Sequence, residues 1–398
     1  MPNLYEPSGK QRIQSIDILR GAIMLIMALD HTRDFFHIAG PTSDPTNMAT
    51  TTPILFFTRW ITHFCAPNFV FLSGLSAYLA GTRRTKSELS AFLIKRGLWL
   101  IFVELVIITF AFSLNPLYNF VLLQVLWVIG FSMVILGLLA RAPLTVIGII
   151  GGLIFFGHDL LDRLQLPKTG FEANLLALLF VAKASILPIG QSHFIFDLYA
   201  LIPWTGVMLL GYVFGPLYKS SFDPRRRRKI LLYTGIAVLA FFGILRYFNH
   251  YGDPNSWSVQ RNGIYSFLSF LNVSKYPPSL MYCCLTIGTG LIILSFTEHI
   301  QNKLTAILVI YGNVPFFYYI LHFYIIRALS IVVFFAQGYG TNQIVNPKGP
   351  FLFIPPHFGF NLFGVYVVWL FVIASLYLPC RWFSKYKKTH NQWWLSYL

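Results

Sequence analysis

The sequence predicts an all-α integral membrane protein, a polytopic bundle of about ten membrane-spanning helices. Of the 398 residues, 56% are hydrophobic and only 11% are charged, whereas a soluble domain carries about 25% charged residues. The mean hydropathy is +0.63. Apolar runs of about 20 residues, the length that crosses a hydrocarbon core, recur along the whole chain.

Ten apolar runs are each expected to span the membrane as a helix. They cover residues 16–37, 54–80, 96–114, 119–139, 144–161, 194–218, 230–248, 278–297, 307–335 and 360–383. The run 173–189 is also apolar, but Lys183, Pro188 and its short length favour an interfacial or re-entrant segment over an eleventh span. We expect residues 1–398 to form a single domain, with long loops at 249–276 and 336–359.

The distribution of Lys and Arg predicts that both termini are cytoplasmic. With ten spans and the N-terminus inside, nineteen Lys and Arg fall in cytoplasmic segments and six in outer segments, as the positive-inside rule requires. An eleventh span would invert everything after it and lose this agreement. The six outer residues are Arg163, Lys168, Lys183, Arg261, Lys275 and Lys348, and the cytoplasmic set includes Lys10, Arg12, Arg83, Arg84 and Arg225 to Arg228.

The formal charge of +16 does not indicate a nucleic-acid-binding protein, because the basic residues lie in short loops between spans. The basic run at 225–229 is interpreted as a topology anchor that could also contact anionic lipid of the bilayer. The four cysteines lie in or beside apolar runs without CxxC spacing, which favours small buried hydrophobes over a zinc or redox site.

The first span carries an unusual number of ionisable residues. Arg20 lies near its cytoplasmic end, and Asp30, His31, Arg33 and Asp34 lie near its outer end. Ionisable groups inside a membrane cost several kcal/mol unless they face a cavity or a partner, so they mark a functional site by default.

The second span can bring a matching polar face to the same depth. Arg59 and His63 are four residues apart, and His31 and Asp34 are three apart, so each pair shares one helix face. Spans joined by a short loop pack together, which predicts one cluster in the outer half. Its members are His31, His37, His63, Asp30, Asp34, Arg33 and Arg59.

Several of these residues have a purely structural alternative. Arg59 and His63 could only neutralise the aspartates, His37 could be a solvated residue where the helix ends, and His322 in the ninth span could be a buried core histidine. A zinc site is not expected, because HxH and HExxH spacings are missing. His158, Asp159, His193 and His357 are expected at the surface.

Five motifs, in order along most of the chain, resemble the membrane acyltransferases related to heparan-alpha-glucosaminide N-acetyltransferase. They read RIQSIDILRG with MALDH (residues 12–21 and 27–31), TRWITHFCAP with FVFLSG (58–67 and 69–74), PWTGVM with GY (203–208 and 211–212), KYPPSL (275–280), and YGN with YILH (311–313 and 319–322). Some relatives carry Asn at the position of His31, and heparan itself is not carried over as a substrate.

The resemblance implies that acetyl-CoA or another acyl-CoA donates an acyl group on the cytoplasmic side. The acceptor would be an amine or hydroxyl on the far side, expected on an amino sugar or glycan. His31 and His37 match the family's candidate catalytic positions. The resemblance and composition together predict an integral protein of the bacterial cytoplasmic (inner) membrane, and a homo-oligomer stays open.

The chemistry of acyl transfer assigns roles to the cluster. His31 could act as a general base or as a nucleophile through an acyl-imidazole. Asp30 or Asp34 could orient its ring, and Arg59 or Arg33 could stabilise the oxyanion. Our catalytic candidates also include His37, His63 and His322. For the CoA donor we expect contacts from Arg20, Arg33, Arg83, Arg84, Trp204 and Arg327.

The alternative function is a proton-coupled secondary transporter, since Asp-His-Arg networks also relay protons. Carriers commonly show two related halves, and no internal repeat is visible in this sequence.

Overall fold

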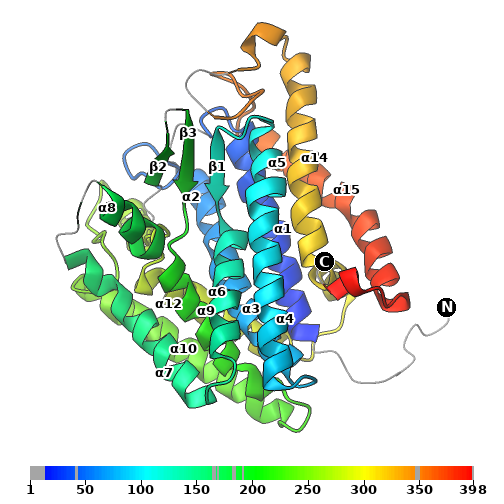
Figure 1. Ribbon diagram of the computed structural model, residues 1–398. Helices are drawn as coiled ribbons and strands as arrows, with labels where there is room; N and C mark the ends of the chain where they lie inside the picture. The colour runs from blue at the N-terminus through cyan, green and yellow to red at the C-terminus, as the bar shows by residue number, and fades with distance from the viewer. Residues whose placement is uncertain are drawn as a thin grey trace.

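The computed structural model describes residues 14–40, 44–163, 167, 170–181, 185–190, 192–345 and 350–396. Within these ranges the chain is mostly helical, with a few short strands at one end (Figure 1). The predicted loop positions of Lys10, Arg12, Lys168, Lys183 and Lys348 fall outside the described residues.

The helical elements follow the apolar runs in chain order. Up to residue 181 they are α1 Gln14–Phe36, α2 Pro53–Trp60, η1 Ile61–Phe64, α3 Cys65–Gly81, α4 Lys86–Phe102, the π-helical η2 Val103–Ile108, α5 Thr109–Ser113, α6 Val125–Leu139, α7 Leu144–Gly157, η3 His158–Arg163, α8 Phe171–Leu176 and the π-helical η4 Ala177–Val181. They continue with α9 Leu201–Val213, η5 Gly215–Tyr218, α10 Pro224–Phe248, α11 Gly263–Leu271, α12 Leu280–Thr297, α13 Lys303–Asn313, α14 Pro315–Ala336, η6 Thr341–Gln343, α15 Leu362–Thr389 and η7 Trp393–Ser396.

Six helices in the described part of the chain are long and apolar enough to cross a membrane. They are Pro53–Gly81, Leu144–Leu161, Pro224–Phe248, Leu280–Thr297, Pro315–Ala336 and Leu362–Thr389. This finding supports the membrane helical class, while ten spans and two cytoplasmic termini stay predictions. Helix α1 is not among the six because five charged residues interrupt its apolar run, namely Asp17, Arg20, Asp30, Arg33 and Asp34.

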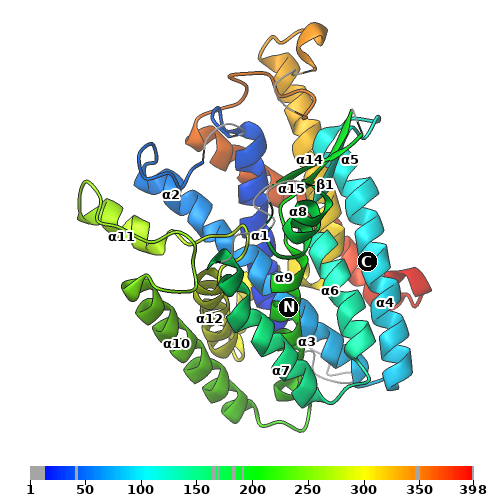
Figure 2. The ribbon, with the colours of Figure 1, turned by 60° about the vertical axis from the view of Figure 1, so that its left-hand side comes forward.

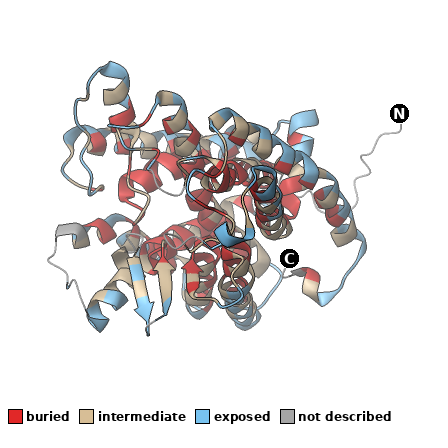
Figure 3. Cartoon of the chain, turned by 90° about the horizontal axis from the view of Figure 1, so that it is seen from above, coloured by how far each residue is buried: buried red, intermediate tan, exposed pale blue. Residues whose placement is uncertain are grey.

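Helix α1 lies at the centre of the bundle (Figure 2), packed against α3, α12, α13, α14 and α15. It crosses α13 so closely that a Cβ at Gly21 would lie 2.0 Å from the carbonyl oxygen of Leu308, and one at Gly312 would lie 1.9 Å from that of Asp17. Small residues allow such close approach of helices in membranes. Seen from above, buried residues gather in the middle of the bundle (Figure 3).

A small sheet of three short strands accompanies the helices of the predicted all-α membrane protein. Its strands are β1 Phe120–Leu123, β2 Ser185–Ile189 and β3 His193–Asp197, in the order β1-β3-β2. Strand β1 pairs in parallel with β3, with Phe120 opposite Phe194, and β2 pairs with β3 in antiparallel fashion. The expected spans 119–139 and 194–218 therefore begin as strands, because a short apolar run suits a strand as well as a helix.

The segment 173–189 is not one helix, since it contains parts of α8, η4 and β2, and residues 182–184 lie outside the described ranges. The expected ninth span, 307–335, is two helices that break at Val314, because the following Pro315 disfavours helical backbone at the preceding residue. The expected loop 249–276 contains helix α11.

Three predicted spans extend further than their apolar runs. Helix α4 begins at Lys86, ten residues before the expected start, where Thr85 and Glu88 form a capping box. Helix α10 begins at Pro224, capped by Asp223, and α15 continues to Thr389. A hydropathy average does not detect the polar first or last turn of a helix, whereas a capping residue in the sequence indicates where a helix begins.

Candidate active site

A cavity of about 190 Å³ lies beside the C-terminal half of α1. Its wall combines segments that are distant in the sequence: the end of α1, the α2–η1–α3 helix, the β1–α6 corner, the β3–α9 connection and the entry to α12. Polar side chains on this wall include Asp30, His31, Asp34, Arg59 and Gln124. The space can hold several water molecules or the reacting ends of two substrates.

Asp30 is the centre of a charge cluster at this wall. Nη1 of Arg59 donates to both of its carboxylate oxygens, and Nη2 of Arg33 donates to Oδ1 at 3.2 Å. Nζ of Lys275 lies 3.8 Å from Oδ2. Arg33 also donates to Oδ1 of Asp34 at 2.5 Å. The polar faces of the first and second predicted spans therefore meet, and three cations surround two carboxylates.

His31 lines the cavity but is not held by a carboxylate. Its ring centroid lies 4.4 Å from that of Phe323 and 5.3 Å from that of His322, both on α14. In the described part of the chain its Nδ1 is buried without a hydrogen-bond partner, and neither Asp30 nor Asp34 is hydrogen-bonded to it. The expected triad-like contact is absent there, because Arg33 and Arg59 already occupy the oxygens of Asp30. Packing against α14 orients the imidazole instead.

His322 is fully buried next to His31. Its Nδ1 lies 3.3 Å from the backbone oxygen of Tyr318. Since a carbonyl only accepts, this contact assigns the proton of the neutral ring to Nδ1 and leaves a lone pair on Nε2. That Nε2 is buried with no partner among the described residues. Two imidazoles with unused nitrogens thus lie side by side, and of the two only His31 is on the described cavity wall.

His37 and His63 stand apart from the cavity wall as described. His37 is half-buried just past α1, where its Nδ1 accepts from the backbone N–H of Ala39 at 3.3 Å. His63 is buried in η1, with its ring 5.6 Å from that of Tyr282. Its neighbours Arg59 and Thr62 line the cavity, so His63 supports the wall from behind.

Three of the donor-binding candidates lie toward the other end of α1 and α3. Arg20 donates to Asp17 at 3.1 Å, to the carbonyl of Gly312 at 3.3 Å and to Ser76 at 2.9 Å. Arg83 and Arg84 are exposed in the turn between α3 and α4, at the lower end of Figure 1. The exposed pair is accessible to a ligand, whereas Arg20 is bonded within the bundle.

Two further candidates are buried in the protein. Arg327 donates to Ser330 at 3.1 Å and to the backbone oxygen of Leu352 at 2.6 Å, and its guanidinium lies 4.7 Å from the ring centroid of Phe35. Trp204 is fully buried on α9, with its ring 5.2 Å from that of Tyr199. Tyr199 and Phe35 line the cavity, so both candidates back the wall rather than form it.

Sequence reasoning missed Lys275 and Gln124 as site residues. Lys275 was counted as an outer loop charge, and only its motif, directly before a span, signalled its position. Gln124 lies at the β1–α6 corner, which Glu104 holds from η2. Oε2 of Glu104 accepts from the backbone N–H of Leu126 at 2.9 Å and of Trp127 at 3.3 Å, and so caps the first turn of α6.

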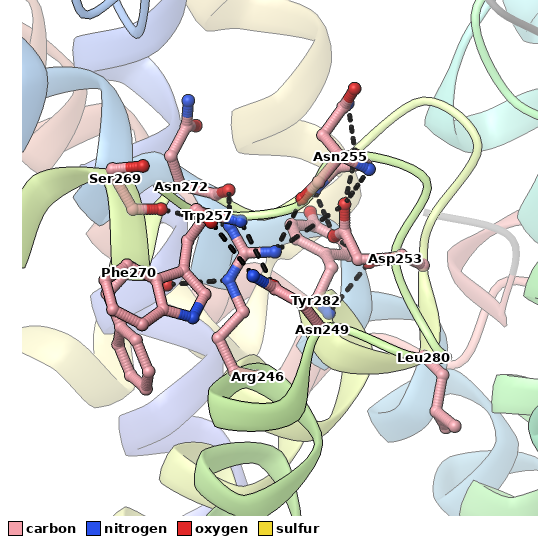
Figure 4. Close-up of polar contacts among 12 residues, drawn as sticks. Arg246, Asn249, Asp253, Asn255, Trp257, Ser269, Phe270, Asn272, Leu280 and Tyr282 are labelled. Atoms are coloured by element: carbon pink, nitrogen blue, oxygen red, sulfur yellow. Dashed lines mark hydrogen bonds and ion pairs between the residues drawn. The ribbon is translucent and has the colours of Figure 1, made fainter. Parts of the chain in front are cut away.

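A polar network joins the end of α10, the segment after it and the start of α12 (Figure 4). Arg246 donates to four backbone oxygens, those of Phe270, Asn255, Ser269 and Asn272. Asp253 accepts from Ser274 N–H and Oγ, both at 2.8 Å, and from Ser279 Oγ at 2.7 Å. Burial raises the pKa of the Asp253 carboxyl, and these hydrogen bonds and Arg246 oppose that shift. Asp253 thereby fixes the backbone on both sides of Lys275.

His158 and Asp159 are buried, which corrects their expected place at the surface. Nε2 of His158 lies 2.7 Å from the backbone oxygen of Pro278, and Oδ2 of Asp159 accepts from Leu280 N–H at 2.8 Å. Both residues therefore hold the start of α12. Across the described residues, no group of three or more His, Cys, Asp or Glu side chains is placed to hold a metal ion.

The model of the family "Heparan-alpha-glucosaminide N-acetyltransferase, catalytic" matches residues 12–250, more than half of the chain. The chain belongs to this family. Among curated proteins, no sequence matches it. Membership in the heparan-alpha-glucosaminide N-acetyltransferase family supports a membrane acetyltransferase-type function, and the family in general uses acetyl-CoA as donor.

The matched part of the chain contains Asp30, His31, Asp34 and Arg59, the residues of the cluster on α1 and α2. It ends at residue 250, before Lys275 and His322. The cavity is thus built from the family's catalytic region together with non-helical residues that follow it, namely Lys275, Tyr276 and Phe351.

Proposed function

We propose that this chain transfers an acetyl or other acyl group from cytoplasmic acyl-CoA to an amine or hydroxyl of a sugar at the outer face. The observation that carries the proposal is His31, a residue of the family's catalytic region that lines a cavity between α1, the α2–η1–α3 helix and the turn before α12. The charged cluster around Asp30 makes this the most polar part of the cavity wall.

His31 is the proposed general base. A neutral imidazole suits proton removal near pH 7, and acceptor attack on a thioester requires such a base. The acceptor loses a proton to His31 as its nitrogen or oxygen bonds to the carbonyl carbon. When the carbon–sulfur bond breaks, the same proton passes to the CoA thiolate. Because no carboxylate is hydrogen-bonded to the ring in the described part, the tilted neighbouring rings of His322 and Phe323 keep it in place.

A nucleophilic His31 is the competing route within the same function. In that case the acyl group first bonds to the ring and CoA leaves before the acceptor binds. Labelled acetyl-CoA added without acceptor separates the two: a stoichiometric burst of free CoA with label on the protein supports the nucleophile, and its absence supports the base.

The donor's phosphates are assigned to the end of α3, where Arg83 and Arg84 are exposed. Replacing both by Ala should raise KM for acetyl-CoA while kcat stays unchanged, because phosphate binding acts far from the reacting atoms. Arg225→Ala, an exposed cation at the start of α10, is the matched control. An unchanged KM in the double variant rejects this assignment.

The test of the function is acceptor-dependent CoA release by the purified protein with labelled acetyl-CoA and glucosamine or other envelope sugars. His31→Ala should lower kcat by about 10²- to 10⁴-fold, with the thermal unfolding midpoint unchanged. His193→Ala, an exposed histidine on β3, should behave as wild type. If no acyl-CoA yields CoA with any acceptor, the function is wrong, and the proton-coupled transporter becomes the better interpretation.

A further inference from the structure

The three cations of the charge cluster, Arg33, Arg59 and Lys275, differ in how closely they bind the carboxylates of Asp30 and Asp34. Arg59 directs Nη1 at both oxygens of Asp30, and Arg33 is 3% exposed and bridges Asp30 and Asp34 from outside the described cavity wall. These two guanidiniums neutralise the two carboxylates. Lys275 is therefore the surplus positive charge of the cluster.

Lys275 lies on the cavity wall with a side chain that is only 9% exposed. Its Nζ is 3.8 Å from Oδ2 of Asp30, which is an ion pair but longer than a hydrogen bond. It lies 5.2 Å from the ring centroid of Tyr276. An ammonium group has three donors, and within the described residues no hydrogen bond uses any of them.

The backbone around Lys275 is fixed on both sides. Asp253 holds Ser274 before it and Ser279 after it, and the N–H of Ser279 donates to the backbone oxygen of Ser274 at 3.1 Å. His158 and Asp159 hold Pro278 and Leu280. A cation presented on such a support is preorganised, which is what stabilisation of a developing charge requires.

From this geometry we infer that Lys275 is a further catalytic residue, whose ammonium donates to the oxyanion of the tetrahedral intermediate. The inference rests on the proposed acyl transfer. As the acceptor bonds to the thioester carbon, the carbonyl π electrons move to its oxygen, and His31 takes the acceptor's proton. Nζ of Lys275 hydrogen-bonds to that oxygen. When the carbonyl reforms, the carbon–sulfur bond breaks, and the thiolate receives the proton from His31.

This role replaces the one expected for Arg33 or Arg59. Arg33 lies outside the described cavity wall, and Arg59 is held through Nη1 to both oxygens of Asp30, whereas Lys275 lies on the wall and only turns from its longer ion pair with Asp30. The oxyanion appears only in the transition state and the intermediate, so Lys275 should contribute to kcat and not to acceptor binding.

The experiment compares Lys275→Met, Lys275→Arg and wild type with acetyl-CoA and glucosamine. Lys275→Met should lower kcat by about 10²- to 10³-fold, the usual effect of removing one oxyanion donor. The KM for glucosamine should stay the same, and Lys275→Arg should keep a large part of the activity. Arg261→Met, an exposed cation of the same outer segment, is the matched control and should leave both constants unchanged.

Two outcomes would overturn the role of Lys275 and leave the proposed acyl transfer standing. If Lys275→Met transfers as fast as wild type, the ammonium does not act in the reaction. If KM for glucosamine rises and kcat stays, Lys275 recognises the acceptor instead. A wild-type protein that transfers to no acceptor would overturn the proposed function as well. The thermal unfolding midpoint of each variant shows whether a loss of activity reflects misfolding. If Lys275→Met misfolds, the Lys275→Arg variant decides: a folded Lys275→Arg protein with a large part of the activity supports the role of the cation, and a folded one without activity contradicts it.

Discussion

Asp30 shows how a buried charged residue depends on its partners. Its side chain is 10% exposed and is shared by Arg59, Arg33 and Lys275. A buried charge without compensation is strongly unfavourable, so the cluster is stable only as a set. The sequence predicted that Arg59 would face Asp30, because both fall at one depth of adjacent spans. The sequence could not predict that Lys275 pairs with Asp30, since that contact depends on how a distant loop folds.

Asp30→Asn should destabilise the fold by about 3 kcal/mol, because it leaves buried cations uncompensated. The measurement is the thermal unfolding midpoint in detergent. Adding Arg59→Met to Asp30→Asn should recover part of the loss, since the double variant buries one cation fewer. Asp44→Asn, in an exposed turn, serves as control and should change nothing. Equal stability of Asp30→Asn and wild type would mean that water screens the cluster.

At the scale of elements, the sequence predicts where most of the long helices lie but not where they break, and ten membrane spans stay a prediction. Long apolar periodic segments gave α1, α10, α12 and α15 with shifted ends. Residues 120–123 are as apolar as the helix that follows them, so only pairing with β3 reveals a strand. Likewise, the π-helical turn at η2 turns the buried Glu104 toward α6, which is a tertiary contact that no local pattern contains.

The crossing of α1 and α13 should not tolerate a side chain at Gly21. Gly21→Ala would place a Cβ 2.0 Å from the backbone oxygen of Leu308, and such overpacking costs about 1–3 kcal/mol. Because α1 carries both Asp30 and His31, activity should fall as well. Gly152→Ala on α7, where a Cβ would meet no atom within 4 Å, is the matched control. Its unfolding midpoint should stay level or rise. If both variants unfold alike, the helices are not in tight contact.

The hydrogen bonds of Asp253 that hold the backbone on both sides of Lys275 can be tested separately from the Lys275 ammonium group. Asp253→Ala removes the acceptor of Ser274 and Ser279, which leaves polar groups unpaired at a cost of about 1–3 kcal/mol. We expect faster proteolysis between residues 250 and 262 and a lower kcat, because Lys275 loses its fixed position. Ser256→Ala, exposed in the same loop, should match wild type in both assays. A normal kcat in a protease-sensitive Asp253→Ala would show that the loop does not position Lys275.

The whole molecule has two chemically different ends. The α3–α4 turn with Arg83 and Arg84 and the basic start of α10 lie together at the lower end of Figure 1, while α5 and the strands lie at the upper end. The cavity is lined by residues from β1, β3 and the entry to α12, so it belongs to the upper half. If basic ends face the cytoplasm, donor and acceptor must approach from opposite sides.

This orientation can be tested with single cysteines at the two ends. Ser220→Cys lies beside the start of α10 and Ser256→Cys in the loop after it, and both serines are exposed. In intact bacterial cells, a membrane-impermeant maleimide should label Ser256→Cys at once and Ser220→Cys only after permeabilisation. The four native cysteines are buried, so the wild-type protein gives the background. The reverse pattern would put the cavity on the cytoplasmic side, where donor and acceptor could meet in one compartment and no acyl group would need to cross the membrane.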